Sequence, residues 1–174
     1  MFRRLMTIAI CVLGTGATAQ TRNVYLQDEA GGRLPIATVE IAPDGTYDIA
    51  MDPTHFADHF LSMRPFKCLD GPEKTWCHVP YPYEIERDIS GGLTDLEYDL
   101  LFVWKGSGDY GINMWNGVYY SLSQDGGVLT GTLREMDMDL LSVPPPAGEL
   151  RPLNPADLHE SDPAGHWLPY LVIE

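Results

Sequence analysis

Basic residues are the first thing that this sequence lacks. Its 174 residues include 11 Lys and Arg against 25 Asp and Glu, which gives a formal net charge of −14. A surface of that sign repels phosphate backbones and anionic headgroups. The composition therefore argues against nucleic-acid binding and against docking to an anionic membrane. It favours a soluble protein that attracts cations or a basic patch on a partner.

The N-terminal apolar run is too short to cross a bilayer. Leu5–Leu13 covers about half of the roughly 20 residues that a transmembrane helix needs. Two arginines precede it and Ala17-Thr18-Ala19 follows it, which is typical of a secretory signal peptide. We predict a cleavable signal peptide over residues 1–19 and an exported protein, periplasmic or secreted, with no membrane insertion after cleavage. Residues 20–174 then form one domain; losing two Arg and no acid leaves 9 basic against 25 acidic residues, a charge of −16.

Cysteine is scarce as well. The chain has 3, and Cys11 lies in the predicted signal peptide, so the exported form keeps Cys68 and Cys77. An isolated pair in an oxidising compartment predicts a disulfide, here around the turn-rich segment 69–76. The spacing differs from the C-x-x-C of redox pairs. A redox pair or a two-cysteine metal site stays open as an alternative.

No catalytic or nucleotide-binding motif is present. Ser107 lies in Gly106-Ser107-Gly108, which is not the G-x-S-x-G of a nucleophile elbow. Glu97 and Glu135 could act as the two carboxylates of a hydrolase, but the sequence does not set their separation. We identify no catalytic residue and expect a non-catalytic protein, with a carboxylate-based hydrolase as the third of three functional hypotheses.

Short alternating segments are what the sequence does contain. Polar and apolar residues alternate in 37–42 and 46–51 around a Pro-Asp-Gly turn, which predicts a hairpin. A second hairpin is predicted from 117–123 and 128–135, joined by a glycine turn. Further strands are expected over 85–89, 96–104 and 168–173, and the last should pair back onto the sheet.

One helix is predicted, over about residues 53–63. Asp52 can cap it, Pro53 suits the first helical position, and aromatic and Met side chains follow at spacings of four and three. Pro65 ends it. Residues 94–97 show some helical character as well.

These elements predict a mainly β or α+β protein. Seven or eight short strands favour an antiparallel sheet curled into a small barrel or sandwich, with a Pro-rich covering segment over 144–167. The segments Trp115–Tyr120 and Leu129–Leu133 resemble small up-and-down barrels of the calycin kind. The resemblance covers only these short segments, and it implies a barrel-like fold without implying a function.

Aromatic and amide side chains gather in one glycine-rich segment. Glycines let a loop approach a ligand closely, and flat rings with amides suit sugars and other planar molecules. We predict the rim of a site for a small-molecule ligand or for another exported protein, and this binding domain is the leading functional hypothesis. The alternative is that the rings pack in the core. The predicted ligand-binding residues are Trp104, Tyr110, Asn113, Trp115, Asn116 and Tyr119.

A metal-handling protein is the second hypothesis. His55 and His59 are four apart on the predicted helix and Met63 is one turn further, so the three would share a face that suits zinc or copper. The acidic run 135–139 offers alternating carboxylates for calcium if its strand continues. We expect no cofactor, and copper, zinc and calcium stay open as alternatives.

Overall fold

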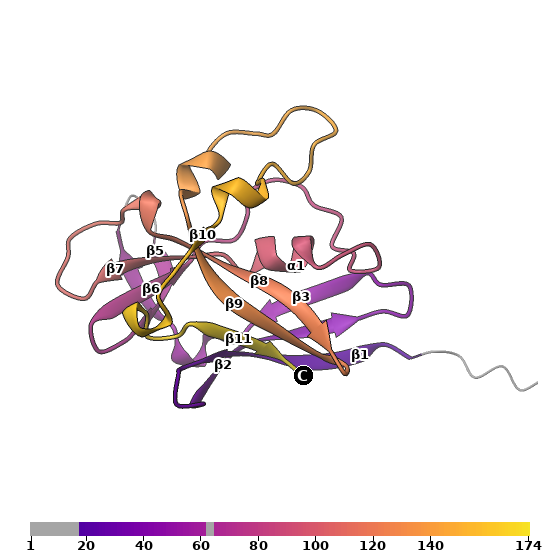
Figure 1. The fold of residues 1–174 in the computed structure, drawn as a ribbon, viewed down its shortest axis with the longest axis horizontal. Coiled ribbons are helices and arrows are strands. Elements are labelled where there is room, and N and C mark those ends of the chain that lie inside the picture. Colours follow the sequence, from indigo (N-terminus) through magenta and orange to yellow (C-terminus); the bar gives the residue numbers. More distant parts are fainter. Residues whose placement is uncertain (1–17, 62–64) are drawn as a thin grey trace, which may run out of the picture.

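The computed structural model describes residues 18–61 and 65–174. Within these ranges eleven strands form one antiparallel sheet, which curls into a half-barrel (Figure 1). The curled antiparallel sheet predicted from the sequence is therefore confirmed. Nearly all of the predicted signal peptide lies outside the described residues, and its cleavage stays a prediction.

The sheet follows the order β3-β2-β1-β11-β9-β8-β7-β6-β5-β4, and β10 pairs with β9 at one side of this path. The strands are β1 (Gln20–Gln27), β2 (Arg33–Ile41), β3 (Tyr47–Met51), β4 (Ala57–Phe60), β5 (Pro65–Asp70), β6 (Lys74–His78), β7 (Phe102–Gly106), β8 (Gly117–Asp125), β9 (Val128–Met136), β10 (His159–Glu160) and β11 (Tyr170–Ile173). The helical elements are α1 (Thr94–Asp99) and the 3-10 turns η1 (Pro53–His55), η2 (Met114–Asn116), η3 (Met138–Leu141), η4 (Pro155–Asp157) and η5 (Pro163–Gly165).

The C-terminal strand joins the two halves of the sheet. β11 lies between β1 and β9, with Ile173 opposite Val24 on one side and Leu129 on the other. Its pairing back onto the sheet is thus confirmed. β1 was not predicted, because polar residues fill its first half and only Val24 and Leu26 are buried in it.

Both predicted hairpins are confirmed. β2 pairs with β3, and β8 pairs with β9 over nine residue pairs. The second turn has its glycines, Gly126 and Gly127, at φ angles of 56° and 98°. These angles lie in the left-handed region, which glycine enters without the steric penalty of a Cβ atom. Local alternation and turn chemistry were enough to predict these pairs.

The helix predicted over 53–63 does not form in the described part of that range, residues 53–61, and that prediction is wrong. The capping signal acts over one turn only: Oδ1 of Asp52 accepts a hydrogen bond from the backbone N of Thr54 at 2.9 Å, and η1 then ends. Phe56 is already extended, and the next residues form β4, which pairs with β5. Pairing at the edge of the sheet overrides the local helix signal.

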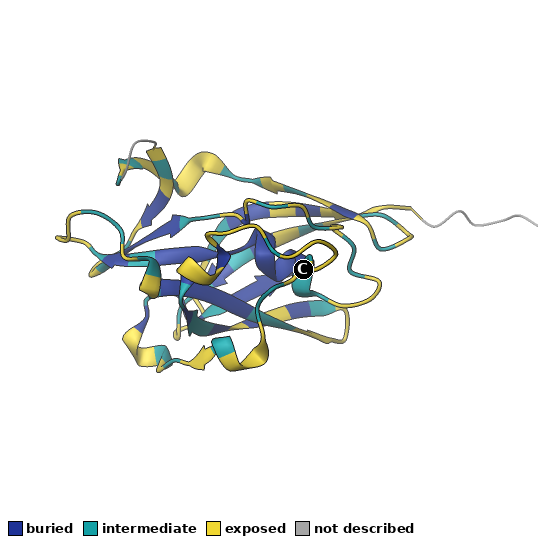
Figure 2. Cartoon of the chain, turned by 90° about the horizontal axis from the view of Figure 1, so that it is seen from above, coloured by how far each residue is buried: buried dark blue, intermediate teal, exposed yellow. Residues whose placement is uncertain are grey.

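The α-helix of the described residues is α1, where a strand over 96–104 was predicted. β7 begins only at Phe102, so the first half of that prediction is wrong. Residues 95–99 are all buried, because α1 lies inside the curve of the sheet against β8 (Figures 1 and 2). Acidic and apolar side chains alternate here because a buried helix contacts other parts of the chain on several sides. The pattern does not mark the two faces of a strand.

The strand predicted over 85–89 is also wrong. In the described ranges this segment contributes one isolated bridge, between Asp88 and Thr46. Arg87 has a φ of 53°, and its carbonyl oxygen accepts a hydrogen bond from the backbone N of Tyr47 at 2.9 Å. The segment therefore covers the start of β3, which is one of the two end strands in the strand order.

Buried carboxylates of α1 bind parts of the chain that are distant in sequence. The Asp99 carboxylate accepts hydrogen bonds from the Tyr47 hydroxyl on β3 at 2.9 Å and from Nε of Arg87 at 3.0 Å. Asp95 pairs with Nε of Arg151 at 2.6 Å, which holds the Pro-rich C-terminal segment against the helix. The helix thus ties the covering segments to the sheet.

Large side chains fill the concave side of the half-barrel. The bulkiest fully buried ones are Trp76, Tyr98, Tyr120 and Phe102. Figure 2 shows the buried residues concentrated in the strands and α1, and the exposed residues in the connecting loops. The interior of the half-barrel is therefore a packed core.

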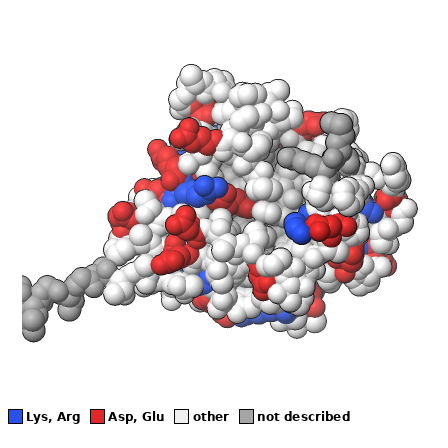
Figure 3. Space-filling view, turned by 180° about the vertical axis from the view of Figure 1, so that it is seen from behind, with Lys and Arg blue, Asp and Glu red and all other residues white. Residues whose placement is uncertain are grey.

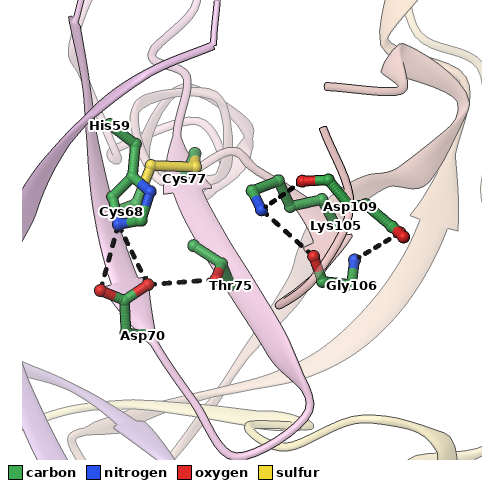
Figure 4. Close-up of a disulfide and its surroundings, with 8 residues drawn as sticks. All are labelled: His59, Cys68, Asp70, Thr75, Cys77, Lys105, Gly106 and Asp109. Atoms are coloured by element: carbon green, nitrogen blue, oxygen red, sulfur yellow. Dashed lines mark hydrogen bonds and ion pairs between the residues drawn. A yellow bond between two sulfur atoms is a disulfide. The ribbon is translucent and has the colours of Figure 1, made fainter. Parts of the chain in front are cut away.

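A disulfide joins Cys68 of β5 to Cys77 of β6, as predicted (Figure 4). The two cysteines are directly opposite each other in the strand pair and fully buried. The bond therefore fixes the register of a hairpin close to the β4 edge of the sheet.

Charge is unevenly distributed on the surface. On the face seen in Figure 3, acidic side chains are scattered widely, and the basic ones lie in a few places beside acidic ones. Among the described helices none has the length and apolar character needed to cross a membrane.

Candidate functional site

The six predicted ligand-binding residues differ in their exposure to solvent. Tyr110 and Trp115 are exposed, the latter by 72%. Tyr119 is buried, and its hydroxyl donates a hydrogen bond to Glu97. Trp104 is partly buried and packs against the main core. The alternative of core packing thus describes Tyr119, while the exposed rings keep the character of a rim.

The two predicted asparagines shape the loop that carries these rings. Oδ1 of Asn113 accepts a hydrogen bond from the backbone N of Trp115 at 3.2 Å, which caps η2. Nδ2 of Asn116 donates to the carbonyl oxygen of Trp104 at 3.1 Å. At the start of the loop, the buried ammonium of Lys105 donates to the carbonyl of Asp109 at 2.9 Å (Figure 4). Their contacts within the chain hold the loop in shape.

Trp115 belongs to an exposed apolar face that the sequence did not predict. The turns η2 and η3 lie against each other, and Leu140 and Val143 are exposed by 46% and 64% on and just after η3. We call Trp115, Leu140 and Val143 the apolar face. Sequence reasoning missed the last two because Leu140 and Val143 lie outside the aromatic segment and join it only in the fold. Large exposed apolar side chains on neighbouring elements are candidates for an interaction site in a soluble protein.

Trp104 takes part in a second cluster, around His166. The Lys74 ammonium lies 4.1 Å from the Trp104 ring centre, and the His166 ring is 5.9 Å from the rings of both Trp104 and Trp76. Nε2 of His166 lies 2.8 Å from the Glu135 carboxylate. His166 and Lys74, with Trp167, also line a hollow of about 280 Å³. The cluster fastens the C-terminal segment to β6, β7 and β9.

Burial makes this cluster sensitive to acid. Desolvation lowers the pKa of His166 below its ordinary value of 6.5, against the opposing effect of Glu135. The unfolded chain therefore takes up this proton at a higher pH than the folded protein does, and stability falls as the pH drops below about 6.5. We expect urea titrations at pH 7.5 and 5.5 to give a smaller drop in unfolding free energy for His166→Gln than for the parent. Equal drops in both proteins would contradict this assignment.

The two histidines of the metal hypothesis do not share a helix face. His55 is exposed on η1, His59 lies on β4 with Nε2 3.0 Å from Asp70 (Figure 4), and Met63 lies outside the described residues. Among the residues that the structure describes, no group of three or more His, Cys, Asp and Glu is arranged to hold a metal ion. Zinc or copper binding stays a prediction without the helix that motivated it.

The acidic run 135–139 does not continue as a strand. β9 ends at Met136, and Oδ1 of Asp137 accepts a hydrogen bond from the backbone N of Asp139 at 2.9 Å at the start of η3. The expected row of three carboxylates on one strand face is therefore wrong. Calcium binding here stays untested.

The two carboxylates of the hydrolase hypothesis bind different partners. Glu97 accepts hydrogen bonds from Tyr119 and from the backbone N of Leu122, whereas Glu135 meets His166. Desolvation raises the pKa of the buried Glu97 carboxyl above its ordinary value. Each carboxylate holds its own part of the structure together, and the fold gives no separate support to their acting as a pair.

Comparison with protein-family models, with curated proteins and with solved structures finds no match to this chain.

Proposed function

We propose that this protein is an exported, non-catalytic binding domain whose apolar face contacts a partner protein. The observation that carries the proposal is the grouping of Trp115, Leu140 and Val143, three large exposed apolar side chains on or just after the neighbouring turns η2 and η3. Tryptophan is enriched among the residues that dominate binding energy at protein interfaces. A partner that covers the exposed Trp115 ring would remove its apolar surface from water, which favours binding.

Charge specifies the kind of partner. Asp137 and Asp139 adjoin the face on η3, and the whole chain carries a formal charge of −14. Like charges across an interface cost free energy and slow association, whereas opposite charges steer it. The partner should therefore present an apolar centre surrounded by Lys and Arg.

A photo-crosslinking amino acid placed at residue 115 tests this proposal. In the exported fraction of the source cells, we expect a discrete adduct with one basic protein. With that protein purified, Trp115→Ala should weaken binding by about tenfold or more, because truncating a central interface Trp typically costs at least about 1–2 kcal/mol. Since the Trp115 side chain is exposed, the unfolding free energy should change by less than about 0.5 kcal/mol.

Phe60 supplies the matched control. Its side chain is exposed by the same 72%, but it lies on β4, at one end of the strand order and far from η2 and η3 in the sequence. A crosslinker at residue 60 should give no adduct with that protein, and the variant Phe60→Ala should leave the affinity unchanged. Equal adducts from positions 115 and 60, or an acidic partner, would count against the proposal.

A further inference from the structure

A small apolar hollow lies where strands from the two ends of the sheet face each other. It has a volume of about 230 Å³ and is lined by Met51 of β3, Pro53 and Phe56 beside η1, Lys67 of β5 and His78 of β6. In the strand order, β3 is one end of the sheet and β5 and β6 lie near the other. The hollow is therefore at the seam that remains open in the half-barrel.

Its walls are mostly carbon. Met51 and Phe56 pack on the main core with their other sides. The ammonium of Lys67 is 2.8 Å from the Asp58 carboxylate, so its charge is already matched at the rim. The hollow therefore attracts neither an anion nor a cation strongly. Its volume is also below the roughly 300–1,000 Å³ of sites for drug-sized ligands. A fitting ligand is neutral and about the size of one ring.

His78 gives the hollow one directional polar group. Its Nε2 lies 2.8 Å from the carbonyl oxygen of Asp99, and since a carbonyl only accepts, Nε2 must carry the proton. Desolvation lowers the pKa of His78, which keeps the ring neutral at pH 7. Nδ1 is then the acceptor nitrogen of the ring. The face of the ring is held by Phe102 at 5.3 Å between ring centres.

We propose that this hollow binds a small neutral molecule with an apolar ring and a hydroxyl group, a phenol in its simplest form. The ring contacts Met51, Pro53 and Phe56, and the hydroxyl donates a hydrogen bond to Nδ1 of His78. The site is separate from the apolar face, so either can exist without the other.

Three matched probes test the proposal on the unaltered protein: p-cresol, 4-methylanisole, whose oxygen cannot donate, and toluene. In titrations followed by amide NMR shifts, we expect p-cresol to give saturable shifts centred on Met51, Phe56 and His78. The other two should bind about three- to tenfold more weakly, which is the worth of one hydrogen bond. Contacts between the p-cresol methyl group and Met51 should appear as intermolecular nuclear Overhauser effects.

The variant His78→Phe removes the acceptor and should abolish the preference for p-cresol over 4-methylanisole. The test compares the affinities of p-cresol and 4-methylanisole for the same variant. A loss of stability in the folded variant affects both affinities alike and leaves their ratio informative. If the variant does not fold, the comparison of probes on the parent protein decides alone. Equal affinity for p-cresol and 4-methylanisole in the parent, shifts that do not saturate, or shifts centred on Trp115 would overturn the proposal. A crosslinking experiment at residue 115 that finds no partner would contradict the proposed function and would not contradict this proposal, because the two sites are separate.

Discussion

Replacing Asp99 with Ala should lower the free energy of unfolding by about 2–4 kcal/mol. The Asp99 side chain is 4% exposed and accepts hydrogen bonds from Tyr47 and Arg87. Removing one partner of a buried ion pair typically costs about 3–5 kcal/mol. Arg87 is half exposed and regains water when its partner is lost, which reduces the cost. The Tyr47 hydroxyl stays buried without an acceptor, which adds about 1–3 kcal/mol.

Urea unfolding of Asp99→Ala, Tyr47→Phe and the double variant measures this contribution. Burial and the neighbouring Asp99 carboxylate both raise the pKa of Tyr47, so the hydroxyl stays protonated and available as a donor. In the double variant the buried hydroxyl is gone, and the two losses should add up to more than the double variant shows. The control is Asp48→Ala, an exposed acid next to Tyr47 on β3, which should change stability by less than about 0.5 kcal/mol. Strict additivity of the two losses would mean that Tyr47 and Asp99 do not stabilise the fold together.

The double variant Cys68→Ala, Cys77→Ala should lose about 2–3 kcal/mol of stability. The disulfide closes a short loop, with the cysteines nine residues apart in sequence, and a loop of this length restricts the unfolded chain by about that amount in the chain-entropy model. Alanine is the better replacement for these fully buried cysteines, because a serine would add a buried hydroxyl. The β4–β6 end of the sheet should also open more often than the β1–β11 region.

Reductant provides the matched measurement. Adding dithiothreitol should lower the urea midpoint of the parent protein toward that of the double variant and leave the variant itself unchanged. Hydrogen exchange should accelerate first at amides of β5 and β6, whose register the bond fixes. A parent protein whose midpoint is insensitive to reductant would show that the covalent link adds nothing to the stability of this hairpin.

Local patterns predicted what depends on local interactions. The β2–β3 and β8–β9 hairpins follow from alternation and from the turns between them, and the disulfide follows from an isolated cysteine pair. The helix over 53–63 was wrong for the complementary reason. Its caps are real, but they stabilise one turn, and pairing with β5 then favours a strand.

The candidate site shows where a single sequence stops being informative. Trp115 and Tyr119 are both aromatic and only four residues apart. Trp115 is exposed, whereas Tyr119 is buried and its hydroxyl donates a hydrogen bond to Glu97. Whether a ring faces water depends on what packs over it: Tyr98 and Glu97 of α1 contact Tyr119, whereas Trp115 stays exposed. The hollow lined by Met51 and His78 was beyond prediction as well, because its walls come from strands at opposite ends of the sheet.

The sequence by itself thus determined an acidic chain, its predicted export, its β-rich class, two hairpins and the cysteine pairing. These depend on composition or on neighbours within a few residues. The tertiary structure alone decided which rings are exposed, where the buried acids find their partners and where a hollow remains. Those properties depend on contacts between segments that lie far apart in the chain, and only the curling of the sheet brings these segments together.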